Sequence, residues 1–334
     1  MMQFKEHIKL IKAKQNLSSE QTVSIFEAIM TGKIEDSDIE DFLLSLSSKG
    51  ESEDELAGGI TVLRNKAIKV NVPEKTIDTC GTGGDGKNTL NISTASAIVL
   101  SSMGVKVAKH GNKALSSKCG SADVLQALKV NINLKSQEVE KSINETNFGF
   151  MFAPNYHTAM KYVGAARKKI GKKTIFNLIG PLSSPAHIKR QIVGVYSKKW
   201  LLPFAKALNK LNSEFSWIVH SDDGMDEISP IATTNIIELR KGKINEFKIE
   251  PKKLGINIKD ESNLKGQDSE FNSKKIIDIL SGNFNDFAIT VSLNVAAGLI
   301  ISENIGKFSD AYYKAKEQIS SGKTLDHLKK IQQF

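Results

Sequence analysis

Hydrophobic positions in the first 70 residues recur at helical spacing, and each helical stretch is preceded by a polar start signal. Three serines are followed, three positions later, by glutamine or glutamate, which is the capping-box pattern. The pairs are Ser18 with Gln21, Ser37 with Glu40, and Ser52 with Glu55. Gly32 and Gly50 stand where helices end, and residues 71–73 have the composition of a linker. The pattern predicts a small all-α domain over residues 1–72.

After residue 73 the pattern changes to short apolar runs that alternate with helical stretches. The apolar runs occupy residues 76–80, 105–109, 148–153, 191–196 and 217–220. Such alternation predicts a mainly parallel central sheet covered by helices. Helical periodicity dominates the last third, over residues 273–282 and 293–302 and in a last helix from about Phe308. We therefore expect a large α/β domain over residues 73–334, joined to the first domain by a helical segment near 164–185.

Composition places the chain among globular proteins. It has 334 residues, of which 40% are hydrophobic and 25% charged, too apolar for disorder. No apolar run approaches the roughly 18 residues of a membrane span, and the N-terminus lacks the apolar core of a signal peptide. Cys80 and Cys119 give neither a disulfide framework nor metal-ligand spacing. We expect a soluble, cytoplasmic protein with no membrane partner.

The net charge of +9 raises the question of a nucleic-acid partner. Lysine accounts for 42 of the 46 basic residues, and aromatic residues make up only 7%. Base recognition relies on arginine, and single-strand binding relies on stacked aromatic rings. We therefore expect a lysine-rich solvated surface and no nucleic-acid partner, with a mild bias toward small anionic substrates.

A glycine-rich turn follows the first apolar run of the α/β part. Residues 76–94 read TIDTCGTGGDGKNTLNIST, which places a strand, a glycine turn and a helix start next to one another. Glycines let the backbone approach a ligand, and the free N–H groups of a helix that starts near Asn91 attract anions. The turn is a candidate site for a phosphorylated ligand. Asp85 inside it should face ribose hydroxyls, a metal ion or a backbone amide.

Other interpretations of this turn remain open. Its glycines also fit the dinucleotide-binding spacing G-x-G-x-x-G, at Gly81, Gly83 and Gly86. A nicotinamide site needs an acidic residue at the end of the next strand, where this chain has Lys109 and His110. The turn is not a P-loop, because Lys87 is followed by asparagine. A glycine-rich connection without any ligand is the remaining alternative.

A second polar loop covers residues 109–123, KHGNKALSSKCGSAD, between an expected strand and an expected helix. Its lysine, histidine and serine side chains could all reach one anionic ligand, although a polar surface turn would have a similar composition. A βαβ unit places this loop beside the glycine turn, at the carboxyl edge of the sheet. Two adjacent anion-binding loops suit a long ligand that carries several phosphates.

Four carboxylates cluster in residues 220–229, HSDDGMDEIS. Asp222 and Asp223 fit an acidic surface turn. Asp226 and Glu227 lie outside that turn, and Mg²⁺ is typically bound by one or two carboxylates together with ligand phosphates. The pair is therefore a candidate metal site, with a solvated turn as the alternative.

One arginine and one histidine in the middle of the chain are further candidates. Arg167 is one of only four arginines and lies in a lysine-rich stretch whose other cations suit a solvated face. An arginine in that setting suits planar, two-pronged recognition of a carboxylate. His157 precedes the same stretch, and a lone loop histidine is more often structural than catalytic.

Seven motifs, in order and spacing, resemble the anthranilate phosphoribosyltransferase family over nearly the whole chain. The motifs are GTGGD at 81–85, NIST at 91–94, KHGN at 109–112, GSAD at 120–123, FAPNYH at 152–157, GPLSSP at 180–185 and GMDEIS at 224–229. The resemblance implies a small helical domain on a large α/β domain of the nucleoside phosphorylase and phosphoribosyltransferase type. It also implies a homodimer that associates through the helical domains. The implied reaction, in tryptophan biosynthesis, transfers phosphoribosyl from phosphoribosyl pyrophosphate to the amine of anthranilate, giving N-(5-phosphoribosyl)anthranilate and pyrophosphate.

The resemblance also assigns residues by position. On phosphoribosyl pyrophosphate it places Gly81, Gly84, Asp85, Thr89, Asn91, Ile92, Ser93, Thr94, Lys109, His110, Gly111, Asn112, Lys113, Ala114, Leu115, Ser116, Ser117 and Ser121. It places Gly81, Asn112 and Arg167 on anthranilate. Two Mg²⁺ ions would be held by Ser93 with Glu227 and by Asp226 with Glu227. Mg²⁺ and Lys109 would offset charge on the leaving pyrophosphate, and no residue is expected to be indispensable as a base.

The chain departs from the common family pattern at four positions. Lys113 stands where arginine is usual, Cys119 where serine is usual, Thr158 where proline is frequent, and Ser184 where asparagine is usual. None of these changes removes a group that the chemistry requires. Two rival functions are a pyrimidine-nucleoside phosphorylase-like enzyme, which needs no paired metal, and a nucleic-acid-binding relative of the same fold. An NAD-dependent dehydrogenase is a more distant one.

Overall fold

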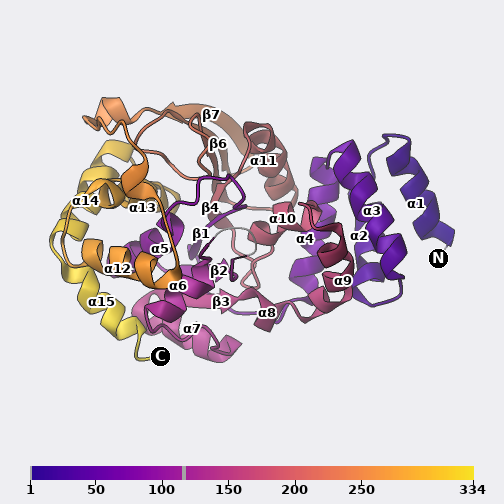
Figure 1. Ribbon diagram of the computed structural model, residues 1–334, viewed down its shortest axis with the longest axis horizontal. Coiled ribbons are helices and arrows are strands. Elements are labelled where there is room, and N and C mark those ends of the chain that lie inside the picture. The colour runs from indigo at the N-terminus through magenta and orange to yellow at the C-terminus, as the bar shows by residue number, and fades with distance from the viewer. Residues whose placement is uncertain (1, 115–117) are drawn as a thin grey trace.

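The computed structural model describes residues 2–114 and 118–334, and its elements form a helical part and an α/β part (Figure 1). The first four helices are α1 (Met2–Lys12), α2 (Ser19–Met30), α3 (Asp36–Lys49) and α4 (Glu53–Lys66). They gather at one end of the molecule, with α9 beside them (Figure 1). The C-terminal end of the chain, coloured yellow, lies at the opposite end, so the long axis runs from the helical part through the sheet (Figure 1).

Two of the three expected capping boxes are present. Ser18 accepts a hydrogen bond from the Gln21 N–H at the start of α2, and Ser52 accepts one from the Glu55 N–H at the start of α4. The expectation at Ser37 is wrong. The cap of α3 is Glu35, without a side-chain bond, so the helix begins before the serine. Acidic residues in the first turn of α3 supply a favourable interaction with the helix dipole instead.

The middle of the chain contributes two helices to the helical part. These are α9 (Lys161–Ile170) and α10 (Ile175–Ile179). Helix α9 packs on α2 and α3, and α10 packs on α3 and α4. The Phe176 ring of α10 lies 5.6 Å from the Phe26 ring of α2. The segment near 164–185 therefore joins the two parts by packing as well as by sequence, while a domain boundary at residue 72 stays a prediction.

The α/β part is built on one sheet of seven strands in the order β3-β2-β1-β4-β5-β6-β7. The strands are β1 (Ile77–Gly81), β2 (Val107–Gly111), β3 (Phe148–Phe152), β4 (Arg190–Gly194), β5 (Phe215–Ser221), β6 (Thr234–Arg240) and β7 (Lys243–Ile249). The first five are parallel to one another, whereas β6 is antiparallel to β5 and β7 is antiparallel to β6. The sheet is mainly parallel, as expected from the sequence.

The β6–β7 hairpin was not among the expected strands. Its turn is Lys241 and Gly242, with φ of 48° and 79°, as a two-residue turn between twisted strands requires. Strand β7 is an edge strand with mostly exposed or half-exposed side chains, so its hydrophobic signal is weak. The hairpin lies at the far edge of the sheet, where it extends the sheet beyond β5.

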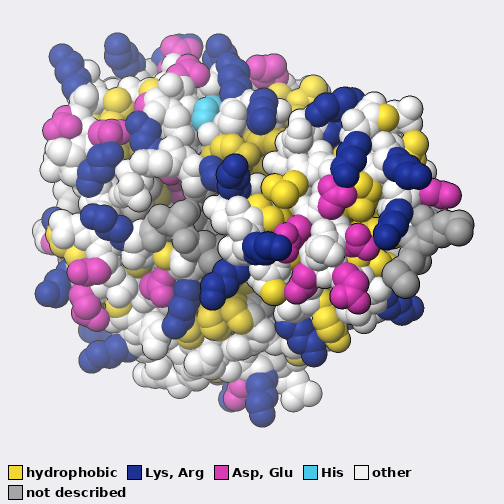
Figure 2. Space-filling view, turned by 45° about the vertical axis from the view of Figure 1, so that its right-hand side comes forward, with side chains coloured by type: hydrophobic (Ala, Val, Ile, Leu, Met, Phe, Trp, Pro, Cys, Tyr) yellow, Lys and Arg dark blue, Asp and Glu magenta, His cyan; other side chains and the backbone are white. Residues whose placement is uncertain are grey.

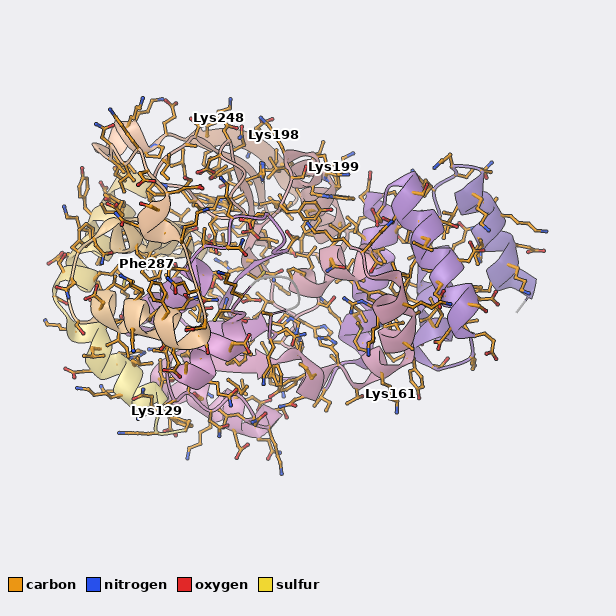
Figure 3. The ribbon with its side chains drawn as sticks, viewed as in Figure 1. Lys129, Lys161, Lys198, Lys199, Lys248 and Phe287 are labelled. Carbon is orange, nitrogen blue, oxygen red and sulfur yellow. The ribbon has the colours of Figure 1, made fainter. Side chains whose placement is uncertain are left out.

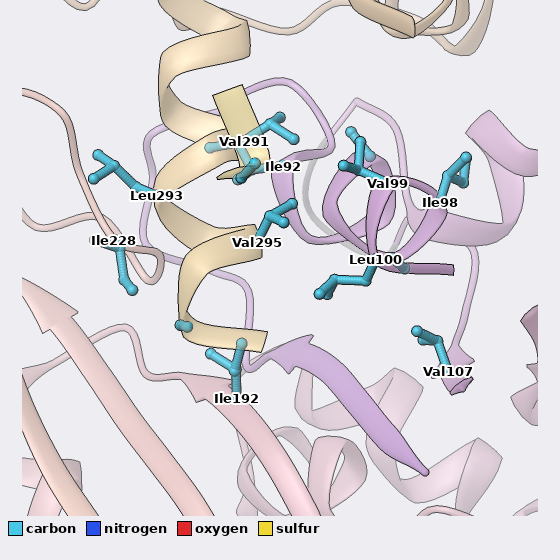
Figure 4. Close-up of a cluster of buried hydrophobic side chains, with 14 of the residues drawn as sticks. Ile92, Ile98, Val99, Leu100, Val107, Ile192, Ile228, Val291, Leu293 and Val295 are labelled. Atoms are coloured by element: carbon cyan, nitrogen blue, oxygen red, sulfur yellow. The ribbon is translucent and has the colours of Figure 1, made fainter. Parts of the chain in front are cut away.

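Helices cover both faces of the sheet. On one face α5 (Ile92–Ser102) and α13 (Asp286–Ile301) meet Ile192 of β4, and Figure 4 shows this cluster with Leu100 and Val295. On the other face α11 (Leu201–Lys210) packs on the sheet and also contacts α4. Val193 of β4 belongs to that second cluster, which continues into the helical part. Consecutive residues of one strand thus pack against the helices on opposite faces of the sheet.

The remaining helices surround these layers. They are α6 (Ser121–Ala127), α7 (Ser136–Thr146), α8 (Ala153–Tyr156), α12 (Ser269–Leu280), α14 (Phe308–Ser320) and α15 (Lys323–Ile331). Short 3₁₀ turns are η1 (Thr158–Met160), η2 (Gly180–Leu182), η3 (Lys198–Trp200), η4 (Pro251–Leu254) and η5 (Ser262–Leu264). The last helix expected from about Phe308 is two helices, separated at Gly322, whose φ is 69°. None of the helices within residues 2–114 and 118–334 has the length and apolar character needed to span a membrane.

Lysines project from the outside of the molecule. Lys129, Lys161, Lys198, Lys199 and Lys248 are all exposed and extend from its rim (Figure 3). On the face shown in Figure 2, basic side chains are interspersed with acidic ones and form no continuous stripe. On this face the distribution is that of a solvated surface and differs from the basic track that a nucleic acid follows.

The topology fixes where a site can form. Because β1, β2, β3, β4 and β5 are parallel, the segments that follow them leave the sheet at one edge. The glycine turn follows β1, the second polar loop follows β2, and the acidic segment follows β5. Segments far apart in sequence are thereby brought to the same edge, next to α9 and α10.

Candidate active site

A cavity of about 880 Å³ opens at this edge, between the sheet and the helical part. It is lined by the loops that follow β1, β2 and β3, by the acidic segment after β5, and by residues of α9 and α10. Every residue that the sequence assigned to a ligand or metal and that the structure describes lies on its wall. Leu115, Ser116 and Ser117 were also assigned to the phosphorylated ligand, and they fall outside the described residues.

The glycine turn is held at its start and open in its middle. The Thr82 N–H donates to the Gly194 carbonyl (2.9 Å), and the Gly83 N–H donates to Asp226 Oδ2 (2.9 Å). The next three amides, of residues 84–86, have no hydrogen-bond acceptor within the described chain. Gly84 has a φ of 72°, a value that residues with a side chain rarely adopt. Three adjacent unpaired amides on a cavity wall form an anion-binding arrangement.

Asp85 stabilises this turn from inside. Its Oδ1 accepts a hydrogen bond from the Lys87 N–H (3.0 Å), and its Oδ2 faces the Asp226 N–H (3.4 Å). The sequence allowed ribose hydroxyls, a metal ion or a backbone amide as partners of this carboxylate, and in the structure its partners are backbone amides. The side chain therefore shapes the turn and leaves the amides of the turn available.

Helix α5 begins at the back of the cavity. Asn91 is its cap residue, as expected for a helix that starts near this position, but its side chain makes no capping hydrogen bond. Its Oδ1 accepts from Asn272 (2.9 Å) and its Nδ2 donates to the Cys119 carbonyl (3.2 Å). The Ser93 N–H in the first turn donates to Glu227 Oε1 (3.1 Å). The Asn91 side chain thus connects the first loop to the second. The Glu227 carboxylate accepts one of the N–H groups at the start of α5.

Asp226 and Glu227 lie side by side on the wall and are partly buried. Burial raises the pKa of Asp226 to about 7, and the nearby charge of Asp85 adds to the rise. Burial raises the pKa of Glu227 to about 8, with Asp226 as the next cause. One oxygen of each carboxylate accepts a hydrogen bond from a backbone N–H. The other oxygen of each has no hydrogen-bond donor in the described chain. A divalent cation would relieve their mutual repulsion.

The described residues do not enclose a metal by themselves. Within the described residues no group of three or more histidine, cysteine, aspartate or glutamate side chains could hold a metal ion. Mg²⁺ commonly binds through one or two carboxylates and completes its shell with water and phosphate oxygens. The donor set of Asp226, Glu227 and the Ser93 hydroxyl fits that habit, provided that a phosphorylated ligand supplies further oxygens.

Lys109 lies at the end of the cavity that is formed by the glycine turn and the carboxylate pair, which we call the donor end. Its side chain is buried, and the residue is 2% exposed. Its Nζ donates to the Thr79 carbonyl (2.5 Å) and to the Ser93 hydroxyl (3.3 Å). Burial lowers the pKa of Lys109, and the charge of Asp78 opposes that fall. Burial raises the pKa of Asp78 itself to about 7. The ammonium therefore donates its hydrogen bonds to oxygens of the protein. It would act on a ligand through its positive charge and through the Ser93 hydroxyl.

The second loop carries its own supports. Asp123 Oδ2 accepts hydrogen bonds from the Ala114 N–H (2.9 Å) and the Gly120 N–H (2.8 Å) across the loop. The Ser121 hydroxyl donates to the Asn112 carbonyl (3.3 Å). Lys113 lies on the cavity wall and is exposed. A carboxylate of α6 thus closes the loop and holds the side chains that line the cavity.

Arg167 marks the opposite end of the cavity. Its guanidinium stacks over the Phe176 ring at 5.3 Å from the centroid, and burial lowers its pKa. No carboxylate within residues 2–114 and 118–334 forms an ion pair with it. Asn112 and Gly81, the other residues expected to meet anthranilate, also line the wall. A half-buried, unpaired guanidinium beside an aromatic ring suits an aromatic carboxylate.

Two histidines meet between these ends. The rings of His110 and His157 lie 5.0 Å apart, and the Nε2 atoms of both are buried without a partner in the described chain. Burial lowers the pKa of His157 to about 4. Burial and the neighbouring His157 place the pKa of His110 well below its usual range. Both rings are therefore neutral at pH 7. The sequence singled out each residue but did not predict the pair, since His110 lies in β2 and His157 follows β3 and α8.

Several wall residues were missed from the sequence. Phe176 forms the aromatic surface at Arg167, and Lys173 donates from Nζ to the Gly84 carbonyl (2.6 Å). Met160 and Asn177 also face the cavity. The lysine-rich stretch around Lys173 gave only the signal of a solvated face. Its position between α9 and α10, which no local pattern indicates, brings it to the cavity.

Comparison with known proteins decides the family. Residues 73–325 match the glycosyl transferase family, a/b domain, and residues 5–67 match the glycosyl transferase family, helical bundle domain. The anthranilate phosphoribosyltransferase of Pelagibacter ubique is 59% identical over 325 residues, 97% of this chain and 98% of that protein. The chain belongs to the anthranilate phosphoribosyltransferase family. A second family member, from Desulfatibacillum aliphaticivorans, is 43% identical and covers 99% of this chain.

Solved structures of the anthranilate phosphoribosyltransferase family share the whole fold. The enzyme from Thermus thermophilus is 33% identical, with a TM-score of 0.92 over 98% of each chain. The Saccharomyces cerevisiae enzyme, in complex with PRPP and Mg, is 28% identical, with a TM-score of 0.89 over 98% of this chain and 96% of that one. The expected family and fold class are confirmed, and the rival functions are not favoured. The assignment of individual residues to ligands stays a prediction.

Proposed function

We propose that this protein transfers the phosphoribosyl group from phosphoribosyl pyrophosphate to the amine of anthranilate. The bond between ribose C1 and the pyrophosphate oxygen breaks, a bond between C1 and the anthranilate nitrogen forms, and that nitrogen loses a proton. One observation carries the proposal. A single cavity has unpaired backbone amides and two carboxylates at one end, and the unpaired guanidinium of Arg167 at the other.

The donor end has the features that a diphosphate ester requires. The amides of residues 84–86, together with the Thr94 N–H in the first turn of α5, have no acceptor in the described chain and provide donors without adding a mobile side chain. Thr89 and Ser121 add hydroxyls on the same wall, and Lys113 adds an exposed cation. Because the backbone donors are held in place before the ligand arrives, little reorganisation is needed when charge develops on the leaving pyrophosphate.

Mg²⁺ fits this end through Ser93, Asp226 and Glu227, and we propose two ions, which share Glu227. When bound, Mg²⁺ neutralises charge on the diphosphate and so supports its departure. The yeast relative, whose structure contains PRPP and Mg, supports the same donor class. The chain itself contributes the fixed orientation of both carboxylates, through the Gly83 and Ser93 amides.

The acceptor end selects an aromatic carboxylate. Arg167 offers two parallel N–H donors, which match a carboxylate better than a lysine would. Phe176 lies against the guanidinium and offers an apolar surface to a ring. Asn112, on the second loop, lines the same cavity. Holding the amine in line with C1 converts a two-body encounter into a reaction within one complex.

No residue is required as a strong base in this scheme. The amine of anthranilate is neutral near pH 7, so its lone pair is available before any proton is removed. His110 and His157 are neutral at that pH and have unpaired nitrogens near the cavity. Either ring can pass on a proton late in the reaction, and solvent can replace it. Loss of all turnover in His110→Ala, with both substrates still bound, would contradict this.

We also propose a homodimer that forms through the helical part. Leu44 of α3 and Tyr162 of α9 are large, exposed apolar side chains, 48% and 37% accessible, on two helices that pack against each other. Light scattering should give twice the chain mass, and Leu44→Glu should shift it toward the monomer. We place the protein in the cytoplasm, where the buried thiols of Cys80 and Cys119 stay reduced.

The proposed reaction is tested by following anthranilate fluorescence after phosphoribosyl pyrophosphate is added. The assay contains Mg²⁺, an enzyme that removes the product, and then an excess of chelator. We expect a loss of fluorescence that stops when the chelator is added. No loss with folded protein would reject anthranilate as the acceptor. Phosphate-dependent cleavage of a pyrimidine nucleoside without Mg²⁺ would favour the phosphorylase instead.

A further inference from the structure

Lys173 spans the cavity from the acceptor side to the donor side. It lies in the connection between α9 and α10, and its Nζ donates to the Gly84 carbonyl (2.6 Å). The same Nζ lies 3.8 Å from the centroid of the Tyr196 ring. No carboxylate in the described part of the chain pairs with it. The ammonium of Lys173 therefore contacts a carbonyl and an aromatic ring beside the glycine turn, with no acid as a partner.

The backbone on both sides of Lys173 is fixed. Gly171, with a φ of 60°, ends α9, and its N–H donates to the Arg167 carbonyl (3.1 Å). Thr174 starts α10, and its N–H donates to Asn177 Oδ1 (3.0 Å). Lys173 and Arg167 are therefore carried by one short, well-anchored segment. A shift of that segment would move both side chains together.

The glycine turn is shaped to accept this lysine. A Cβ on Gly84 would come within 2.6 Å of both Cε and Nζ of Lys173. Tyr196, the other partner of Nζ, donates its N–H to the Thr82 hydroxyl (3.0 Å). Lys173 thus contacts the turn directly and through a residue that anchors the turn to β4. The absence of a side chain at position 84 permits the contact.

The contact has a consequence for the anion-binding amides. The Gly84 carbonyl and the Asp85 N–H belong to one planar peptide group and point in opposite directions. A hydrogen bond that fixes the carbonyl therefore also fixes the N–H, which is one of the three unpaired amides of the turn. Holding this peptide in one orientation keeps a donor available for an anion and adds a positive charge nearby.

We propose that Lys173 is a positioning residue that couples the diphosphate-binding turn to the acceptor-binding segment. This inference rests on the proposed function for the identity of the two ligands. An anion in the turn stabilises the peptide orientation that Lys173 holds, and thereby the segment that carries Arg167. A carboxylate at Arg167 stabilises the same segment, and hence the turn. By thermodynamic linkage each ligand must then raise the affinity for the other by the same factor.

The test measures that factor directly. Calorimetry gives the affinity for inorganic pyrophosphate with Mg²⁺, in the absence and presence of saturating anthranilate, and the reverse titration checks reciprocity. Steady-state rates give KM for phosphoribosyl pyrophosphate and kcat. The variants are Lys173→Met, Lys173→Arg and the control Lys172→Met. Lys172 is exposed and makes no hydrogen bond or ion pair in the described chain.

In wild-type protein we expect anthranilate to raise pyrophosphate affinity by about fivefold or more, the lower end of typical couplings. Lys173→Met should abolish that factor and raise KM for the donor, with kcat changed less. Lys173→Arg should restore part of the coupling, and Lys172→Met should match wild type. A thermal melt confirms that each variant is folded.

Two outcomes would overturn the inference. One is a wild-type protein in which neither ligand changes the affinity for the other. The second is a Lys173→Met variant that keeps the wild-type factor. Failure of the proposed function has a different signature, because wild-type protein would then consume no anthranilate at all. Turnover with unchanged coupling in Lys173→Met rejects only the role of Lys173.

Discussion

The main chain of Asp226 passes directly over Gly194, so that the Asp226 carbonyl oxygen occupies the place of a Cβ on that glycine. Gly194 is the last residue of β4, and its own carbonyl accepts the Thr82 N–H of the glycine turn. One position therefore sets the distance between the donor turn and the carboxylate pair. The close approach is possible only because β4 ends in glycine.

Gly194→Ala should displace Asp226 and separate the carboxylates from the glycine turn. Since the overlap is with backbone, which cannot rotate away, we expect a loss of about 2 kcal/mol or more in the free energy of unfolding, and weak Mg²⁺-dependent activity. Gly164→Ala is the control, because nothing lies within 4 Å of a Cβ there. In the exposed helix interior it should stabilise by about 0.5–1 kcal/mol. Urea unfolding of both variants checks this, and equal effects would contradict it.

Glu227→Gln should lower activity without lowering the stability of the metal-free protein. The amide resembles the uncharged carboxyl that burial and Asp226 favour at this position, so the metal-free protein should melt at or above the wild-type temperature. Activity should fall about 10- to 100-fold or more, the usual range for weakened metal ligation. Mg²⁺ with pyrophosphate should raise the melting temperature of wild type but not of the variant. Asp222→Asn, on the exposed turn, is the control, and a variant that still responds fully to Mg²⁺ would exclude Glu227 as a ligand.

Arg167→Lys should behave almost like Arg167→Ala. The ammonium keeps the charge but loses the paired donors and the stacking on Phe176. A charged hydrogen bond contributes about 1.5–3 kcal/mol, so we expect KM for anthranilate to rise about 10- to 100-fold, with KM for the donor changed less. Lys168→Met, one position along and exposed, should leave both constants unchanged. Full activity in Arg167→Lys would show that charge alone suffices.

The parts of the site that could be predicted from sequence are those carried by local chemistry. The glycine turn and the Asp226–Glu227 pair were predicted to belong to a binding site from a few residues each, because backbone freedom and paired carboxylates are local properties, and both line the cavity. Asn112 was assigned only by the family resemblance. Lys173 and Phe176 could not be found in this way. Their roles arise from how α9 and α10 pack against the sheet, which depends on contacts between segments far apart in the chain.

The same distinction holds for the fold. Strongly apolar strands and capped helices were predictable, since burial and capping leave a mark in each segment. The β6–β7 hairpin was missed because β7 is an edge strand with little buried surface. The split between α14 and α15 was missed because Gly322 lies between two stretches of similar helical periodicity. Ser37 was misplaced because a serine followed three positions later by glutamate also occurs inside a helix.

The two serine patterns give a direct stability test. Ser52→Ala removes the hydroxyl that accepts the Glu55 N–H at the start of α4, and should cost about 1 kcal/mol of unfolding free energy. Ser37 makes no capping bond and is exposed in the first turn of α3. Ser37→Ala should therefore change stability by less than about 0.5 kcal/mol. If chemical denaturation showed that both variants lose the same unfolding free energy, Ser37 would have to form a capping box after all.

The buried His157 should make the protein sensitive to mild acid. Its pKa is about 4 in the folded protein and near 6.5 when exposed, so between these values the unfolded chain binds more protons. Stability is therefore complete above pH 6.5 and is lost as the pH falls toward 4, by about 2 kcal/mol at pH 5. His110 adds to the effect, because burial and the charges of His157, Lys109 and Arg64 lower its own pKa well below the usual value.

His157→Asn should remove the His157 contribution to this acid sensitivity. The variant loses packing at every pH, so the informative quantity is the difference in unfolding free energy between pH 7.5 and pH 5. That difference should be smaller than in wild type by about 2 kcal/mol, because asparagine has no proton to gain. Carboxylates that titrate in the same range are common to both proteins and cancel in the comparison. If the two proteins lose the same free energy between these pH values, the neutral, buried state of His157 is not the cause.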